Sequence, residues 1–174
     1  MACEIDAGDL KGCRNGKGGI KSVYFLQVEH ASAITVSATN EVTAITVTTG
    51  NRAWQYALEM NLSTFSDVLT GSRDNGSLFA QQSLTVILND NALATRNALM
   101  LLAQNDLISI VELANGDYEM LGANNGLSVV TDTRDAGTVK ADRNGHTIVM
   151  EGQEDELAYK VDSTIIAGLL TPAP

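Results

Sequence analysis

Proline is nearly missing from this chain of 174 residues, since the only two, Pro172 and Pro174, lie among its last three positions. Proline has no backbone N–H and interrupts strand pairing, so a chain without it over its first 171 residues keeps these donors available for β-sheets. Long hydrophobic runs are also lacking, and no segment approaches the roughly 20 apolar residues of a membrane-spanning helix. The first residues do not show the basic-then-apolar profile of a signal peptide. We therefore expect one globular domain, made and folded in a cytoplasm.

Basic residues are in short supply. The chain has 11 lysines and arginines against 21 aspartates and glutamates, which gives a formal net charge of -10. A protein that grips nucleic acid by its phosphates needs a basic footprint, so this balance argues against that class. It is compatible with a protein past which nucleic acid slides, because repulsion between acidic side chains and phosphates would then help.

Cysteine and histidine are scarce as well. Cys3 and Cys13 both lie near the amino terminus, and His30 and His146 show no ligand spacing relative to them, so no metal site is expected. A disulfide between the two cysteines is geometrically possible, but a reducing cytoplasm favours free thiols.

Motifs of catalytic chemistry are missing too. The sequence contains no G-x-S-x-G, H-E-x-x-H, C-x-x-C or G-x-G-x-x-G pattern, and no motif gives either histidine a Ser or Cys partner. Gly16-Lys17-Gly18-Gly19 superficially resembles a phosphate loop, but the Walker spacing is absent and no Ser or Thr directly follows the lysine. We therefore expect a structural or binding protein that is not an enzyme and holds no cofactor.

Acidic residues in the last third of the chain offer no better evidence for a metal site. The side chains that could be imagined as calcium ligands are Asp132, Asp135, Asp142 and Asn144. An EF-hand loop needs a terminal Glu and tighter spacing, so solvated turns are the expectation. The charge run over residues 151–156 is likewise expected to be a solvated loop.

What the sequence does contain is strand periodicity around one helix. Residues 83–88 alternate as a strand, Asn89-Asp90-Asn91 offers N-cap side chains, and good helix formers follow, which predicts a helix over about 90–104. Residues 107–113 then predict a buried strand, and Asn115-Gly116 predicts a type I′ turn into residues 117–121. The apolar face of the helix is expected to comprise Ala94, Ala98, Leu101 and Leu102.

The rest of the chain is typical of short strands and turns. Between residues 52 and 60 large side chains alternate with polar ones, and Trp54, Tyr56, Leu58 and Met60 are expected to face a core. A Trp-Tyr pair can also stack on a ligand or base, but at strand spacing among aliphatic residues core packing is more common. Residues 52–88 together predict one long hairpin, whose tip around 63–80 projects beyond its own subunit; an ordinary surface excursion is the alternative. Further strands are predicted over 20–28, 33–37, 42–48, 127–131, 138–142, 146–151 and 157–161.

These elements predict a mainly β protein with one α-helix, folded as an antiparallel β-sandwich or barrel with a long hairpin. The expected organisation is an extended N-terminal arm over 1–19, a β-domain over 20–162 and a C-terminal tail over 163–174. The arm is rich in glycine and needs a neighbouring surface to hold it.

Several sequence features come together with this order of elements in an acidic chain. They are Cys3 and Cys13 in the opening arm, Gly18-Gly19-Ile20 leading into Val23-Tyr24, the run Asn115-Gly116…Tyr118…Leu121-Gly122…Asn125-Gly126-Leu127, and Asp142…Asn144-Gly145 before an apolar strand. Together they resemble the tail tube proteins of tailed bacteriophages, in particular those of phages infecting Bacteroidetes-type hosts. Relatives of these proteins form the tubes of contractile injection systems. The resemblance covers most of the chain.

The resemblance implies a structural virion protein. Six subunits would close a ring, and stacked rings would form the tail tube that conducts DNA during ejection, with the helix outside the bore. Implied partners are further copies of the chain, the tape measure protein, the tail terminator, baseplate or tip proteins and, in a contractile tail, a sheath. DNA would pass without specific binding, no membrane insertion is implied, and the protein would reside in the virion after assembly in the host cytoplasm.

The tail-tube hypothesis assigns two sets of residues. Candidate contacts between subunits are Ile5, Leu10, Ile20, Phe65, Leu78, Phe79, Ile165 and Leu169. Candidate acidic residues of the lumen are Glu29, Glu41, Glu59 and Asp67, which lie on or beside predicted strands. Two alternatives remain: a tail terminator or other head–tail or decoration protein, and a small-molecule-binding β-barrel.

Overall fold

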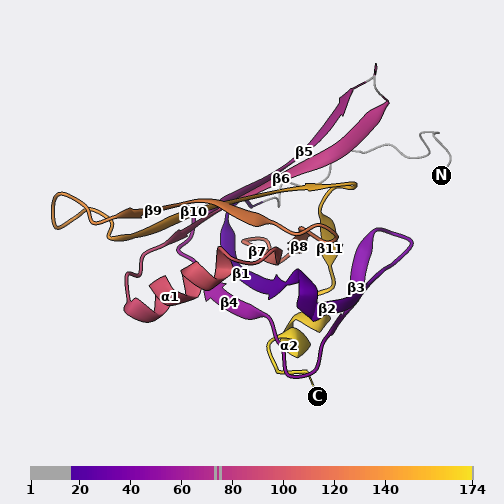
Figure 1. The fold of residues 1–174 in the computed structure, drawn as a ribbon, viewed down its shortest axis with the longest axis horizontal. Coiled ribbons are helices and arrows are strands. Elements are labelled where there is room, and N and C mark those ends of the chain that lie inside the picture. The colour runs from indigo at the N-terminus through magenta and orange to yellow at the C-terminus, as the bar shows by residue number, and fades with distance from the viewer. Residues whose placement is uncertain (1–16, 73, 75, 174) are drawn as a thin grey trace.

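The computed structural model describes residues 17–72, 74 and 76–173, whose strands form two sheets packed face to face (Figure 1). The larger sheet has seven strands in the order β2-β3-β11-β8-β7-β1-β4, and the smaller has four in the order β5-β6-β10-β9. The strands are β1 (Ile20–Gln27), β2 (Ala31–Val36), β3 (Glu41–Val47), β4 (Trp54–Ala57), β5 (Thr64–Ser72), β6 (Ser77–Leu88), β7 (Leu107–Leu113), β8 (Tyr118–Leu121), β9 (Ser128–Asp135), β10 (Gly145–Glu154) and β11 (Tyr159–Val161). The helices are α1 (Leu93–Leu102) and α2 (Ile166–Leu169), with 3-10 turns η1 (Val28–His30) and η2 (Ser163–Ile165).

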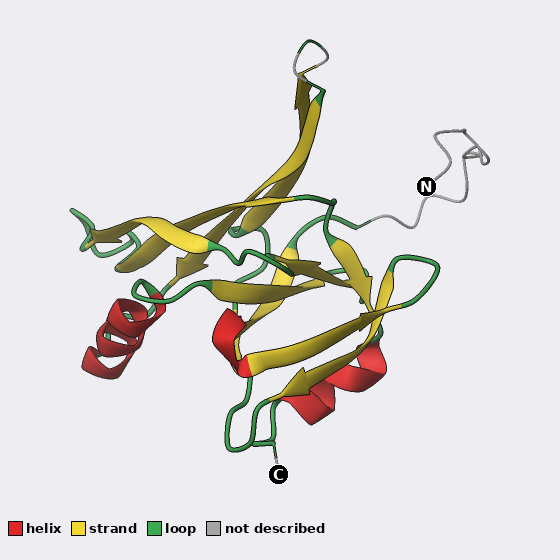
Figure 2. Cartoon of the chain, turned by 45° about the vertical axis from the view of Figure 1, so that its right-hand side comes forward, coloured by secondary structure: helices red, strands yellow, loops and turns green. Residues whose placement is uncertain are grey.

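The predicted mainly β fold is confirmed, with two corrections. All neighbouring strands are antiparallel except β3 and β11, which run parallel. A second, four-residue helix, α2, forms in the segment expected to be a tail (Figure 2). The apolar segment is too short to show a helical repeat, so the helix could not be predicted from the sequence without its packing.

One apolar core lies between the two sheets. It contains side chains from alternate positions of the central strands, chiefly Val23, Phe25, Leu84, Val86, Val111, Ile148 and Met150. A period of two places these residues on one face of their strands, as the sequence pattern of residues 83–88 predicts. The smaller sheet therefore has one buried face and one face turned away from the core.

A second core lies on the opposite face of the larger sheet. Tyr24 and Leu26 of β1 pack there with Ile108 and Ile110 of β7, and α2 covers them with buried apolar side chains. β1 and β7 are thus buried on both faces, which explains their nearly continuous apolar sequence. The strand predicted over 20–28 is thus confirmed as β1, with a covering layer on each of its faces.

Helix α1 is confirmed at its predicted place but is loosely attached. Only Leu99 is fully buried, with Ala98 and Leu102 half-buried beside it. Two members of the predicted apolar face, Ala94 and Leu101, are exposed. The helix contacts the body through one narrow stripe, next to the open end of the core between the sheets. The observed contact face is therefore rotated relative to the predicted apolar face.

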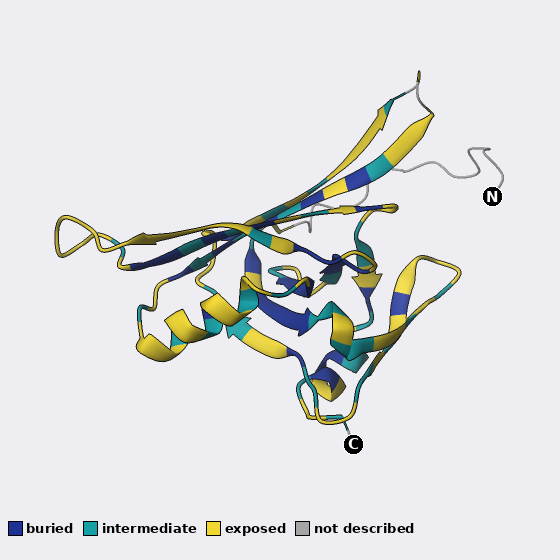
Figure 3. Cartoon of the chain, in the orientation of Figure 1, coloured by how far each residue is buried: buried dark blue, intermediate teal, exposed yellow. Residues whose placement is uncertain are grey.

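The segment 52–88 is not one hairpin. β4 pairs with β1 in the larger sheet, whereas β5 and β6 form a hairpin in the smaller sheet with Ser72 opposite Ser77. Trp54 and Met60, predicted to face a core, are exposed. The predicted alternation of side chains along the strand is confirmed. However, β4 lies at the edge of its sheet beside an open recess, and no second layer covers part of one strand face. The β5–β6 hairpin projects well beyond the second layer, and its outer part is exposed (Figure 3).

Two predicted local structures are corrected by hydrogen bonding. At Asn115-Gly116 only the glycine has a positive φ, +93°, and Gly116 N–H donates to Leu113 O at 3.0 Å. The connection is therefore a three-residue loop closed by a glycine bulge, not a type I′ turn. The predicted strand over 138–142 is a turn, because the Asp142 carboxylate accepts the backbone N–H groups of Thr138 and Val139.

Candidate functional site

One surface without a covering layer is the face of the four-stranded sheet that points away from the core, here called the outer face. The register and burial pattern place the following side chains on it: Thr64, Ser66, Val68 and Thr70 of β5; Phe79, Gln81, Ser83, Thr85 and Ile87 of β6; Thr147, Val149, Glu151 and Gln153 of β10; Ser128, Thr131, Thr133 and Asp135 of β9. Threonine, serine and glutamine predominate. Glu151 and Asp135 carry negative charge, and no lysine or arginine is among these described strand side chains. From the turn between β9 and β10, however, the guanidinium of Arg143 reaches this face, where it donates to Thr147 Oγ1 at 2.7 Å and lies 3.6 Å from the Asp135 carboxylate. The outer face is thus polar, and the basic group at its margin is paired with an acidic one.

Both edges of the four-stranded sheet are open. β5 pairs only with β6 and β9 pairs only with β10 within the described part of the chain. Each edge therefore presents unpaired backbone N–H and C=O groups, which can template pairing with another chain. A bulge between Val149 and Met150 interrupts the β9–β10 ladder, whereas the β5–β6 ladder is regular from Thr64 to Ser72.

The projecting hairpin carries apolar side chains without a second layer to cover them. Leu69 and Leu78 lie on its inner side and are exposed, Leu78 by 63%. Val68 on the outer side is exposed as well, and Phe79 beside it is half-buried. A two-stranded ribbon gains little stability by itself, so these side chains need a partner surface.

The structure separates the six described residues of the predicted contact set into three groups. Ile20 and Leu169 are 2% and 5% exposed within their own chain, so they are core residues and their assignment to contacts between subunits is wrong. Phe65 packs against the first core and Ile165 against the second, both half-buried. Ile5 and Leu10 lie outside the described residues. Of the predicted set, Leu78 and Phe79 lie on the projecting hairpin and are available for contact.

The predicted acidic residues of a lumen do not gather on one surface. Glu29 lies in η1, Glu41 at the start of β3 and Glu59 in the loop after β4, all exposed and none on the outer face. Asp67 points to the inner side of β5, where its carboxylate accepts the backbone N–H of Ala158 at 2.6 Å. The acidic residues of the outer face, Glu151 and Asp135, were missed, because the sequence does not reveal which face of a strand is uncovered.

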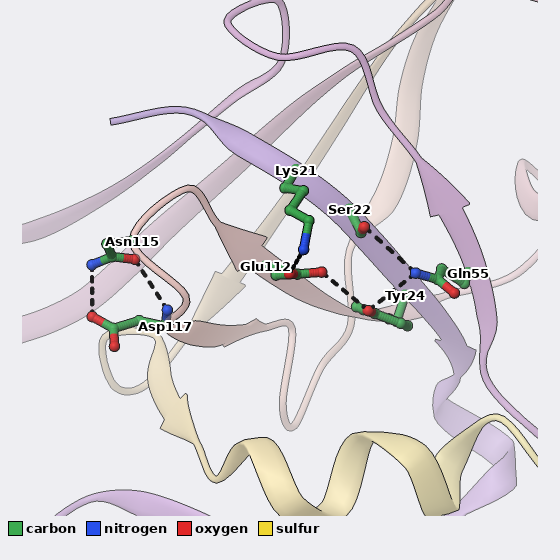
Figure 4. Close-up of polar contacts among 7 residues, drawn as sticks. All are labelled: Lys21, Ser22, Tyr24, Gln55, Glu112, Asn115 and Asp117. Atoms are coloured by element: carbon green, nitrogen blue, oxygen red, sulfur yellow. Dashed lines mark hydrogen bonds and ion pairs between the residues drawn. The ribbon is translucent and has the colours of Figure 1, made fainter. Parts of the chain in front are cut away.

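A polar network crosses the larger sheet at the start of β1 (Figure 4). The buried carboxylate of Glu112 accepts hydrogen bonds from Lys21 Nζ and from Tyr24 Oη at 3.3 Å. Gln55 on β4 donates to Tyr24 Oη at 3.2 Å. Burial and the neighbouring Glu112 carboxylate raise the pKa of Tyr24 to about 12, and the hydrogen bond to Glu112 raises the pKa of Lys21. The network joins three strands, β1, β4 and β7, and we assign it to the stability of the fold.

Two further buried polar side chains form hydrogen bonds within the chain. Glu154, expected in a solvated loop, is buried and accepts backbone N–H groups of residues 124–126. His146 Nδ1 lies 3.0 Å from the carboxylate of Asp132, a residue that was expected in a solvated turn. Both pairs join residues distant in sequence, so no local signal could have found them.

An apolar recess of about 580 Å³ opens between α1, the β1–β4 edge and the C-terminal segment. Phe25, Tyr56, Leu102 and Leu107 contribute apolar lining, and the exposed side chain of Trp54 lies at its rim. The guanidinium of Arg52 lies 4.1 Å from the centre of the Trp54 ring. The alternation of residues 52–60 contains this site, although it was expected to be closed core.

Signals of other site types are lacking within the described ranges. No group of three His, Cys, Asp or Glu side chains there is arranged to hold a metal ion. No helix among the same residues is long and apolar enough to cross a membrane. A comparison of the chain with protein-family models, curated proteins and solved structures returned no match.

Proposed function

We propose that this chain is the subunit of a phage tail tube, in which copies close into rings, rings stack, and the outer face of the four-stranded sheet lines the bore. The observation that carries the proposal is the composition of that face: its described strand side chains are rich in threonine, serine and glutamine and include no lysine or arginine, and the guanidinium of Arg143, which reaches the face from the β9–β10 turn, is paired with Asp135. A surface used to hold nucleic acid would carry lysine and arginine.

The same composition suits the passage of a polyanion. A basic bore would bind phosphates tightly through release of their counterions and would retain DNA. A neutral to acidic bore, in a chain with a net charge of -10, repels phosphates weakly and gives DNA no anchor. Conduction would then be passive, and no residue would need to act chemically.

The open edges supply a physical reason for ring closure. An exposed β5 edge and an exposed β9 edge lie on opposite sides of the same sheet. Pairing β9 of one copy with β5 of the next is a head-to-tail contact, which closes into a ring when the rotation per copy is a whole fraction of a turn. Closure removes every free edge of this sheet and with it the tendency to aggregate. Six copies, a tape measure protein, a terminator and tip proteins are what the family resemblance adds.

Electron microscopy of the purified full-length protein tests the proposal. Long hollow tubes with stacked rings are expected. Lone rings would favour the tail terminator, and particles without a central channel would exclude both. Tight binding of duplex DNA at physiological salt would also contradict the proposal, because the bore would then retain its cargo.

A small-molecule-binding protein is the second candidate, favoured by the recess of about 580 Å³ beside α1. Its volume falls in the range of roughly 300–1,000 Å³ typical of ligand pockets. Native mass spectrometry of the purified protein distinguishes the two, since a retained ligand of constant mass on a monomer would support binding and oppose the tube.

A further inference from the structure

The recess beside α1 leaves apolar and aromatic side chains facing solvent. About 580 Å³ stands open against Phe25, Tyr56 and Leu102, while the neighbouring side chains of Trp54 and Leu101 are 57% and 62% exposed. Helix α1, which forms one wall, fully buries only Leu99 against the body. An apolar occupant would remove these side chains from water and is therefore favoured.

The charge of the recess restricts the occupant. Arg52 and His30 are the ionisable basic side chains of its described lining, and no acidic side chain contributes to it. The Arg52 guanidinium is held over the Trp54 ring, an arrangement that keeps its N–H groups available to a carboxylate. In a chain with a net charge of -10, an apolar recess with a basic rim is matched by a segment that is both apolar and acidic.

The chain itself contains such a segment outside the described residues. Residues 4–10 read EIDAGDL: Glu4, Asp6 and Asp9 are acidic, Ile5 and Leu10 are large and apolar, and none is basic. The charge of this segment is therefore complementary to the rim of the recess. Its apolar side chains match the aromatic and aliphatic lining.

Chain length favours a segment from another copy. The described chain begins at Lys17, and Gly19 O accepts the N–H of Ala114 at the start of β1, whereas the recess adjoins Phe25 and Gln27 toward its end. The eight residues of β1 extend over about 23 Å at ~3.3 Å per residue. The lining runs from Tyr56, opposite Val23, to Gln27, so residues 11–16 would have to double back along roughly half of that length or more before residues 4–10 could enter the recess. A neighbouring copy meets no such restriction.

We propose that residues 4–10 of one copy dock into the recess between α1 and β4 of a neighbouring copy, with Ile5 and Leu10 against the apolar lining and an acidic side chain paired with Arg52. The contact needs a second copy but neither a ring nor a tube, so it stands or falls independently of the proposed function. It also closes the first core at its open end.

Trp54 is the only tryptophan of the chain, so its fluorescence reports on this recess alone. In the full-length protein, acrylamide is expected to quench Trp54 several-fold less than in an Ile5→Ser/Leu10→Ser variant, and quenching should rise on dilution as copies separate. Equal quenching in the two proteins would overturn the docking. Shielding that survives these substitutions would instead assign the recess to a bound small molecule.

A charge exchange tests the pairing with Arg52. Arg52→Glu is expected to raise quenching, and Glu4→Lys, Asp6→Lys or Asp9→Lys on that background should restore shielding in at least one case. Asp155→Lys is the control, an added lysine on an exposed loop. Failure of all three restorations, or equal restoration by the control, contradicts the electrostatic match.

Energy transfer between copies tests the origin of the segment. One copy carries an acceptor dye on Cys3 together with Cys13→Ser and Trp54→Phe, and the other retains Trp54 with both cysteines replaced by serine. Transfer from Trp54 to the dye is expected in the mixture. Transfer found only when the dye and Trp54 share one copy would overturn docking between copies.

Discussion

The carboxylate of Glu154, at the end of β10, accepts the backbone N–H of Asn125 at 2.8 Å. Asn124 and Gly126 donate to the same side chain at 3.2 and 3.3 Å. Glu154 is 3% exposed, so these bonds are protected from water. The side chain thereby fixes the loop between β8 and β9 to the end of the four-stranded sheet. Because β8 belongs to the larger sheet, the contact also connects the two sheets.

Replacing Glu154 tests this connection. Glu154→Ala leaves three backbone N–H groups without their acceptor, and hydrogen bonds to a charged group contribute about 1.5–3 kcal/mol each at most, so we expect a loss of about 2–3 kcal/mol in the free energy of unfolding. Urea denaturation measures it. Asp155→Asn, next in sequence and exposed, serves as the control and should change the value by less than about 0.5 kcal/mol. Equal effects of the two substitutions would show that the Glu154 contacts add nothing.

Alkaline pH should weaken the fold through Tyr24. Its pKa is raised from 10.0 to about 12, by burial first and by Glu112 second, so the unfolded chain loses this proton at lower pH than the folded protein. The stabilisation is complete below pH 10.0 and is lost as the pH rises toward 12. Lys21, whose pKa is also raised, acts in the same direction.

The measurement is the free energy of unfolding as a function of pH. Its decline between pH 10.0 and 12 should be steeper in the native sequence than in a Tyr24→Phe variant, which retains the ring and removes the titrating hydroxyl. Parallel curves for the two proteins would rule out a contribution from Tyr24.

Two glycines provide a matched pair for testing backbone packing. A Cβ at Gly145 would lie 2.0 Å from the backbone oxygen of Leu88, so Gly145→Ala forces β6 and β10 apart and should cost about 1–3 kcal/mol. Gly168 in α2 has open space at the same position, and Gly168→Ala should be neutral or stabilise by up to about 1 kcal/mol. Thermal unfolding of both variants gives the comparison, and a neutral Gly145→Ala would contradict the close approach.

The hairpin should matter for assembly and little for the single chain. Leu78 is 63% exposed, so Leu78→Ser is expected to change the free energy of unfolding by less than about 0.5 kcal/mol. Removing its apolar contact with a neighbouring copy should nevertheless abolish or shorten the tubes seen by electron microscopy. Leu93→Ser, 70% exposed at the start of α1, is the control. Tubes of normal length in the Leu78 variant would remove this residue from the interface.

Basic side chains on the outer face should turn a conducting surface into a retaining one. Thr85 on β6 and Thr147 on β10 both lie on this face, and Thr85→Lys/Thr147→Lys should make the assembled protein bind duplex DNA with an affinity that falls as salt rises. Thr43→Lys/Thr46→Lys, at two exposed positions of β3, controls for the added charge. DNA binding that is the same for both sets of lysines would argue that the outer face does not line the bore.

Local patterns were enough to predict many of the elements. The patterns correctly predicted a strand at 83–88, which is the second half of β6, helix α1 at 93–103 and strand β7 at 107–113. Periodicity and helix propensity depend on a few neighbouring residues, so they can be recognised in the sequence. The strand alternation at Trp54 and Tyr56 was also real. Tyr56 and Leu58 pack against the first core as expected, but Trp54 and Met60 are exposed, because a large side chain on a strand face is buried only where a second layer extends over it.

By itself, then, the sequence determined a mainly β chain with open strand donors, one principal helix and an excess of negative charge. Only the tertiary structure decided which faces are covered: it buried Ile20 and Leu169, exposed Trp54, and left the polar face of the four-stranded sheet without a covering layer. The physical reason is that burial depends on contacts between residues distant in sequence, such as Glu154 with residues 124–126. A period of two says that a strand has two faces, and only packing decides which one meets water.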